Sequence, residues 1–427
     1  MPRVTIDSSA PRFLVDGEPQ FLLSDTIWCA FARPTLGEWR AYLRLRRRQG
    51  FNALNINILS IPHDRSASTV AGVERSPFLP AADGSWDLDR PDPAYFANAR
   101  AMLELAIEHG MVPTLVVLWC NYVPGTWGAA LTPELVLTEE QTDRYVDLVI
   151  ESFADLGVTF AASGDDNFTD PRSADRYERV LRRLREKAPD TLLTLHPGVY
   201  VTQPPQLTGG DLMDYYSYQA GHDEGWDTQP GEQATGLRAM PVRRPIVSME
   251  PCYEGHGYGK GSGRHTAADV RLASWSSVLA GAGAGLGYGA HGVWSWHRPG
   301  EPFNGEHFSG TPFPADVALR FDGAWDVGLL RRLVEAHGLH DLASRQDLVV
   351  GDRSGARFGL QESPRRAALY LPHPFAVTID ADLSGWQVEC WNLGARNRDR
   401  PNLTVEDGRT RIEQPEFLSD SLFLFTG

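Results

Sequence analysis

Two carboxylic acids, Asp165 and Glu250, each end a short apolar run of the sequence, VTFAASGD (158–165) and PIVSMEP (245–251). An ionised carboxylate beside apolar residues is costly unless it is paired or used, because burial disfavours the charge. Two such groups that face one another across a pocket can hold different protonation states at neutral pH, one as proton donor and one as nucleophile. The structural alternative for either acid is an N-cap of the next helix or a partner for an arginine.

Short apolar runs alternate with amphipathic helical stretches over the first 340 or so residues, which is the pattern of repeated βα units. Strands are predicted at 21–28, 51–59, 112–119, 158–165, 192–197, 213–221, 245–251 and 285–296. Helices are predicted at 36–49, 94–109, 139–154, 174–187, 267–279 and 326–336. This number and order of strands predicts a (β/α)₈ TIM barrel. A doubly wound open sheet is the alternative, but no GxGxxG follows the first strand, and the glycine run at 281–285 follows a helix.

From about residue 345 the sequence pattern changes to short predicted strands separated by turns, which is typical of a small antiparallel β-sandwich. We therefore expect an α/β chain with a barrel domain over residues 1–342 and a C-terminal β-sandwich domain over 343–427.

Functional side chains of such a barrel lie at the C-terminal ends of its strands. Four tryptophans, Trp28, Trp119, Trp294 and Trp296, fall at these predicted positions. A flat indole ring there can stack on the C–H face of a sugar, although closure of the core is an equal alternative for each ring alone. Four such rings beside two acids favour a carbohydrate pocket, and paired carboxylates are what glycoside hydrolysis requires.

Other chemistries are less well supported. The histidines lack H-x-H and H-E-x-x-H spacing, so we expect them to hydrogen-bond a substrate or orient a carboxylate, and we predict no metal and no cofactor. No G-x-S-x-G elbow is present, and SGDDN lacks the remaining ligands of a calcium loop.

Net charge and composition limit the classes of molecule that the protein is expected to bind. The net charge of −15 and the absence of a basic block argue against nucleic acid and membrane surfaces and suit a small, neutral carbohydrate. Four cysteines lie far apart without a CxxC pair, and the first residues do not form a secretory signal pattern, so we predict a reducing, cytoplasmic location. The sequence leaves the oligomeric state open, a homo-oligomer included.

The chain resembles the apiosidase-like glycoside hydrolases, which usually carry a C-terminal domain labelled as collagen-binding. The resemblance covers nearly the whole chain and rests on stretches such as FLLSDTIW, SGDDN, TLHP, SYQAGH, RPIVSMEPCYEG and YGAHGVWSW. It implies a retaining barrel enzyme with Asp165 as acid/base and Glu250 as nucleophile. The chain departs from the family's usual GGD and W-G motifs at Ser163 and Cys120, and Asp166 adds a second acid next to Asp165.

We accordingly predict an exo-acting retaining glycosidase that releases an apiose-like or other furanoside or pentoside sugar. A pyranosidase and a non-catalytic carbohydrate-binding protein are the alternatives. Besides the two catalytic acids, twelve residues are predicted to contact or support the substrate: Asp25, Trp28, Asn55, Trp119, Asp166, His196, Gln219, His222, Tyr253, Glu254, Trp294 and Trp296.

Overall fold

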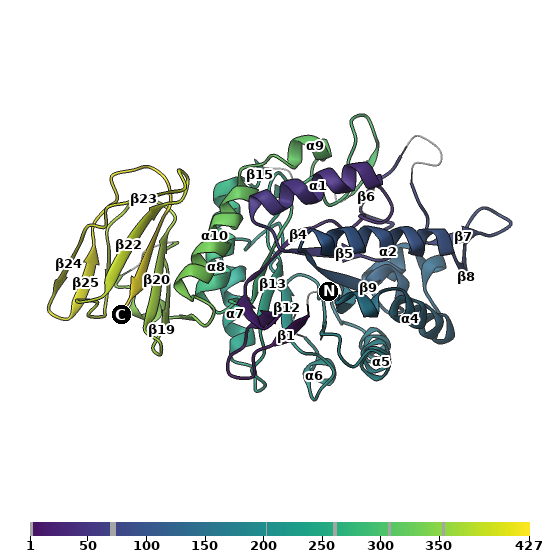
Figure 1. Ribbon diagram of the computed structural model, residues 1–427, viewed down its shortest axis with the longest axis horizontal. Coiled ribbons are helices and arrows are strands. Elements are labelled where there is room, and N and C mark those ends of the chain that lie inside the picture. The colour runs from purple at the N-terminus through teal and green to yellow at the C-terminus, as the bar shows by residue number, and fades with distance from the viewer. Residues whose placement is uncertain (1–2, 69–73, 202, 259–262, 306–308, 352–354) are drawn as a thin grey trace.

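The computed structural model of the chain describes residues 3–68, 74–201, 203–258, 263–305, 309–351 and 355–427 (Figure 1). One sheet of eight parallel strands forms the centre of the larger part, and neighbours in this sheet follow the order of the sequence. Its members are β4 (Leu22–Thr26), β5 (Ala53–Asn57), β9 (Val112–Trp119), β10 (Thr159–Gly164), β11 (Leu193–Thr194), β12 (Tyr216–Gln219), β13 (Ile246–Glu250) and β16 (Gly285–Tyr288).

The sheet curls into a barrel, because β16 pairs with β4 and the two remaining edges, β11 and β12, approach one another. At that seam the Asp214 N–H donates to the Leu193 carbonyl at 2.8 Å, and a single parallel bridge joins Val199 to Gln219. The predicted fold class, a (β/α)₈ barrel followed by an antiparallel sandwich, is confirmed.

Helices cover the outside of the barrel (Figure 1). The longer ones are α1 (Leu36–Gln49), α2 (Pro93–Glu108), α4 (Glu139–Phe153), α5 (Pro171–Lys187), α7 (Gln229–Arg238), α8 (Ala267–Leu279) and α10 (Gly323–His337). Short ones are α3 (Trp127–Leu131), α6 (Pro205–Thr208) and α9 (Ala315–Ala318). Side-chain caps fix several of the starts; Thr35 and Glu38, for example, form a capping box at α1. Among the described residues, no helix is both long and apolar enough to cross a membrane.

Small antiparallel elements lie outside the main sheet. They are β1 (Val4–Ile6), β2 (Phe13–Val15) and β3 (Glu18–Gln20) in one sheet, and the pairs β6 (Arg65–Ser66) with β17 (Phe303–Asn304), β7 (Phe78–Pro80) with β8 (Trp86–Pro91), and β14 (Gly257–Tyr258) with β15 (Gly263–Arg264). The predicted loop between the second strand and the second helix therefore contains a hairpin, β7–β8.

The C-terminal part consists of two antiparallel sheets with a hydrophobic core of their own. One sheet has the order β18 (Ala343–Ser344), β19 (Arg357–Gln361), β20 (Arg366–Leu371), β26 (Ser421–Thr426), β22 (Gln387–Asn392) and β23 (Asn397–Asp399). The other has the order β21 (Val377–Ile379), β25 (Arg409–Ile412) and β24 (Leu403–Glu406). The division of the chain at residue 342 stays a prediction.

The sandwich packs against α8 and α10 (Figure 1). Arg271 of α8 pairs with Asp326 of α10 at 2.6 Å and with Asp420 of the sandwich at 2.7 Å, while Arg396 of the sandwich reaches the same Asp326. Both acids are buried, and removal of Arg271 would leave the Asp420 carboxylate without its guanidinium partner.

Several elements differ from the sequence-based prediction, and three of them show why. The strand predicted at 285–296 ends at Tyr288, because the backbone turns away at glycines, and Gly292 adopts φ 126°. Helix α7 was not predicted, since Pro230, Gly231 and Gly236 obscure its helical pattern. The apolar run DLVVG at 347–351, which is typical of a strand, instead overlaps a 3₁₀ turn at Gln346–Leu348 and forms one isolated bridge, from Val349 to Ile379.

Candidate active site

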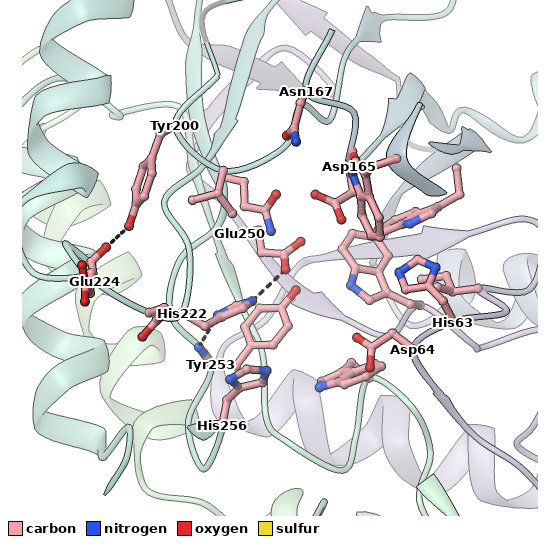
Figure 2. Close-up of a pocket in the computed structure, with 18 residues that line it drawn as sticks. His63, Asp64, Asp165, Asn167, Tyr200, His222, Glu224, Glu250, Tyr253 and His256 are labelled. Atoms are coloured by element: carbon pink, nitrogen blue, oxygen red, sulfur yellow. Dashed lines mark hydrogen bonds and ion pairs between the residues drawn. The ribbon is translucent and has the colours of Figure 1, made fainter. Parts of the chain in front are cut away.

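A pocket of about 400 Å³ lies at the C-terminal ends of the barrel strands (Figure 2). Its walls come from the strand ends and from the loops that follow them. The lining residues are Trp28, Ile61, His63, Asp64, Trp119, Trp127, Asp165, Asn167, Val199, Tyr200, Gln219, His222, Asp223, Glu224, Glu250, Tyr253, His256 and Trp294.

Glu250, the last residue of β13, lies between two imidazoles. Its Oε1 is 3.0 Å from Nε2 of His222, and its Oε2 is 2.9 Å from Nε2 of His196. Burial alone would raise the pKa of Glu250, but the polar contacts with the two imidazoles outweigh this effect and lower the pKa to about 2. Glu250 is therefore a carboxylate at any ordinary pH, although it is buried.

The tautomer of His222 follows from its second contact. The backbone N–H of Tyr253 donates to Nδ1 of His222 at 3.3 Å. A nitrogen that accepts an N–H carries no proton in the neutral ring, so the proton lies on Nε2 and is donated to Glu250. His196 itself does not line the pocket; it lies behind Glu250, and its ring is in contact with the rings of Trp28 and Trp119.

Asp165 follows β10 and faces Glu250 across the pocket (Figure 2). Its backbone has φ 55°, a left-handed conformation that is sparsely populated outside glycine and is often found at functional sites. Two hydrogen bonds hold it there: its N–H donates to the His196 carbonyl at 2.8 Å, and its carbonyl accepts from Nε1 of Trp127 at 2.8 Å. The residue before it is glycine because a Cβ at Gly164 would lie 2.4 Å from the Trp119 ring.

Asp166 is turned away from the pocket. Burial raises the pKa of its carboxyl, although Ser173 and nearby backbone N–H groups oppose this by hydrogen bonding. The structure therefore places Asp165 in the pocket and Asp166 beside Ser173 of α5.

The predicted aromatic set is largely gathered in one place. Trp28, Trp119 and Trp294 line the pocket, and Tyr253 joins them with its hydroxyl directed towards Glu250 (Figure 2). Trp28 packs edge-on against Trp119, with ring centroids 5.1 Å apart. The buried N–H groups of Trp119 and Trp294 and the amide oxygen of Gln219 have no hydrogen-bond partner within the described part of the chain. A buried polar atom without a partner is costly, so these three atoms are suited to a polar ligand.

Besides His196 and Asp166, four further predicted contact residues lie outside the pocket. Asp25 is buried against α1, where it accepts from Tyr42 at 2.6 Å and from Arg46 at 2.7 Å. The Asn55 amide donates to the Met249 carbonyl and so joins two strands. The carbonyl of Trp296 accepts from Arg33.

Glu254 is the fourth of these residues. Its Oε2 accepts from the Tyr288 hydroxyl at 2.7 Å and from the Gly323 N–H at 2.9 Å, so it links the segment after β13 to the start of α10. Burial raises the pKa of Glu254 to about 7, and the charges of Asp326 and Asp322 add to this effect.

Ten lining residues were not predicted to contact the substrate: Ile61, His63, Asp64, Trp127, Asn167, Val199, Tyr200, Asp223, Glu224 and His256. They belong to the loops after the strands, where no periodicity marks the side chains that turn inwards. Asn167 and Asp223 could have been found, since each directly follows a predicted site residue, Asp166 and His222 respectively.

Several histidines cluster near the pocket, and the rings of His222 and His256 are 4.4 Å apart. Burial lowers the pKa of His256 well below its ordinary value, which leaves its ring neutral. Within the described ranges, no three His, Cys, Asp or Glu side chains are arranged to hold a metal ion.

A family model described as "Apiosidase-like, catalytic domain" matches residues 8–341. The chain belongs to this family, and it is a glycoside hydrolase. The match does not extend into the C-terminal sandwich, whose likeness to the domain labelled as collagen-binding remains an expectation.

Solved structures show the same fold at low identity. One called a glycoside hydrolase has a TM-score of 0.78 and 17% identity, covering 99% of this chain and 96% of its own. A family 5 glycoside hydrolase from Bacteroides vulgatus has a TM-score of 0.78 and 17% identity, covering 99% and 93%. A family 5 mannosidase from Rhizomucor miehei has a TM-score of 0.53 and 12% identity, covering 80% and 100%. A comparison with curated proteins gives no match.

Proposed function

We propose that the protein is a retaining, exo-acting glycosidase that releases an apiose-like or other furanoside or pentoside sugar from a small glycoside. One observation carries this proposal. Glu250 is held ionised by two imidazoles in the same pocket into which Asp165 points. An ionised carboxylate opposite a second acid is the arrangement that double displacement at an anomeric carbon needs.

In the first step, a Glu250 oxygen attacks the anomeric carbon, and the bond from that carbon to the leaving oxygen breaks. Asp165 gives its proton to the leaving oxygen, so the aglycone departs as a neutral alcohol. In the second step, Asp165 takes a proton from water while the water oxygen displaces Glu250 from the anomeric carbon. Glu250 returns as a carboxylate, Asp165 regains its proton, and the sugar leaves with its original anomeric configuration.

The lining supports a sugar as the substrate. The rings of Trp28, Trp119 and Trp294 offer apolar faces. The N–H groups of Trp119 and Trp294 and the amide oxygen of Gln219 offer polar atoms that have no partner among the described residues. A volume of about 400 Å³ suits one or two sugar rings better than a polymer, which supports exo action on a small glycoside. Four free cysteines support the proposed cytoplasmic location.

The test is a panel of 4-nitrophenyl furanosides and pyranosides, assayed with the wild type and with Asp165→Ala and Glu250→Ala. We expect cleavage of a furanoside or pentoside, a first-formed product of retained configuration by NMR, and partial rescue of the Asp165→Ala or Glu250→Ala variant by azide. A product of inverted configuration would exclude double displacement. Cleavage of pyranosides alone would identify a different sugar specificity, and calorimetric binding without turnover would identify a carbohydrate-binding protein.

A further inference from the structure

Tyr200 is the exposed aromatic residue of the pocket. Among the described lining residues it is the one large apolar side chain that is exposed, at 42%, whereas Trp28, Trp119 and Trp294 are all at 4% or below. The buried rings therefore close one part of the pocket, and Tyr200 stands where the pocket meets solvent. Figure 2 shows it on the side away from His63 and Asp64.

The Tyr200 ring is fixed, not free to turn. Its backbone has φ 61°, a left-handed conformation that is unfavourable for a bulky residue. Its hydroxyl donates to the Glu224 carbonyl in the loop after β12. Two glycines of that loop, Gly221 with φ 81° and Gly225 with φ 83°, turn its backbone next to the Tyr200 hydroxyl.

A bulky residue held in a strained conformation with its ring exposed needs a reason outside folding, because neither burial nor backbone preference favours it. We infer that Tyr200 forms the leaving-group subsite of the pocket and stacks on a ring-shaped, uncharged aglycone, either a second sugar or an aromatic group. This inference rests on the proposed glycosidase function and adds the substrate class on the far side of the bond that is cut.

Two observations support this assignment. Trp28 and Trp119 pack against His196, which contacts Glu250, so a sugar attacked by Glu250 would lie among the buried rings and the rest of the substrate would extend to the open end. Asp223 and Glu224 line the same side as Tyr200, and their charges disfavour an anionic leaving group such as a phosphate or a uronic acid.

The experiment compares leaving groups on the glycone that the panel identifies. Three probes are used: the 4-nitrophenyl glycoside, a disaccharide with the same glycone, and the glycosyl fluoride, whose leaving group has no ring. Tyr200→Ala is expected to lower kcat/KM roughly 10- to 100-fold for a ring-bearing probe and less than about 3-fold for the fluoride. Tyr200→Phe keeps the ring and is expected to stay within about 3-fold on all probes. Trp325→Ala, which removes an exposed aromatic of α10 outside the pocket, is the matched control.

Each outcome either supports or overturns the leaving-group subsite at Tyr200. A loss on the disaccharide identifies a sugar as aglycone, and a loss on the 4-nitrophenyl glycoside alone identifies an aromatic one. Equal losses on the fluoride and on the ring-bearing probes, or no loss on any, would overturn the subsite. If the wild type cleaves nothing, calorimetric binding of the same glycosides that weakens with Tyr200→Ala but not with Trp325→Ala supports the subsite while the proposed catalysis fails. Glycosides neither cleaved nor bound would end both proposals.

Discussion

Glu250 and Glu254 are two buried glutamates in one segment of the chain, and their carboxyl groups have opposite character. Glu250 is 5% exposed with a pKa of about 2, and Glu254 is 7% exposed with a pKa of about 7. The two side chains are thus buried almost equally, and burial cannot explain why their pKa values differ. Each oxygen of Glu250 faces an imidazole, whereas both donors to Glu254 meet a single oxygen and two aspartates lie nearby. The groups around a carboxyl, more than its depth, decide its charge.

The first way to test this contrast is to neutralise each glutamate with a residue of the same shape. Glu250→Gln removes the nucleophile and should lower kcat on the order of 10⁴-fold or more. Glu254→Gln keeps an oxygen that can accept from Tyr288 and Gly323, so its kcat should stay within about tenfold of the wild type. Steady-state kinetics on the best aryl glycoside measures both, and comparable losses would contradict the separate roles.

The contributions of the two glutamates to the free energy of unfolding should depend on pH with opposite signs. The pKa of Glu254 is raised above its ordinary value of 4.5, so the folded state binds more protons than the unfolded state between pH 4.5 and about 7. Its contribution is present below pH 4.5 and is lost as the pH rises through 7, by about 3 kcal/mol. Glu254→Gln should therefore gain about this much stability relative to the wild type between pH 4.5 and 8.

Urea unfolding of the wild type and Glu254→Gln at pH 4.5 and at pH 8 measures this gain in stability, because contributions common to the two proteins cancel. Glu250→Gln serves as the contrasting variant. The pKa of Glu250 is lowered, so its contribution is present above pH 4.5 and is lost as the pH falls towards 2. A Glu254→Gln stability difference that does not change with pH would show that Glu254 is ionised in the folded protein.

The positions of these glutamates could be predicted from the sequence, but their partners could not. Asp165 and Glu250 end apolar runs, and strand order alone brings the ends of barrel strands to one face. Asp25 also ends such a run, yet it faces α1 and Arg46. Both faces of a barrel strand are buried, so the sequence shows no alternation of polar and apolar residues. The pattern therefore does not reveal whether a side chain at the end of a strand points into the pocket or towards the surrounding helices.

Loop residues escaped prediction for a related reason. Tyr200 and His256 reach the pocket through turns whose φ angles and glycine contacts exist only in the folded chain. Trp127 begins the short helix α3 in the connection after β9, and its role appears only when its N–H donates to the Asp165 carbonyl. The gross fold follows from periodicity, whereas contacts between distant segments depend on the packing of those segments.

A third, smaller effect is expected from His222, one of the two imidazoles that contact Glu250. His222→Asn should raise the pKa of Glu250, because a donor to the carboxylate is lost, and a hydrogen bond to a charged group is worth about 1.5–3 kcal/mol. That energy corresponds to an upward shift of the acid limb of kcat/KM by about one to two pH units. His256→Asn, which changes a neighbouring imidazole whose Nδ1 contacts the Gly257 carbonyl, should leave the acid limb in place. Identical pH profiles for the wild type and His222→Asn would show that His196 alone sets the charge of Glu250.

The smallest expected effect is that of Tyr288→Phe, which removes one of the two donors to Glu254. The Tyr288 hydroxyl lowers the pKa of Glu254 against the effect of burial, so its loss should raise that pKa further. Loss of the bond should also lower the free energy of unfolding by about 1 kcal/mol, since Gly323 still donates to the same oxygen. In the double variant Tyr288→Phe/Glu254→Gln the pH-dependent part of this loss should vanish, because no titrating group remains there. Urea unfolding of the four proteins at pH 5 and pH 8 measures the coupling, and an equal pH-dependent loss in both backgrounds would show that Tyr288 acts on a group other than Glu254.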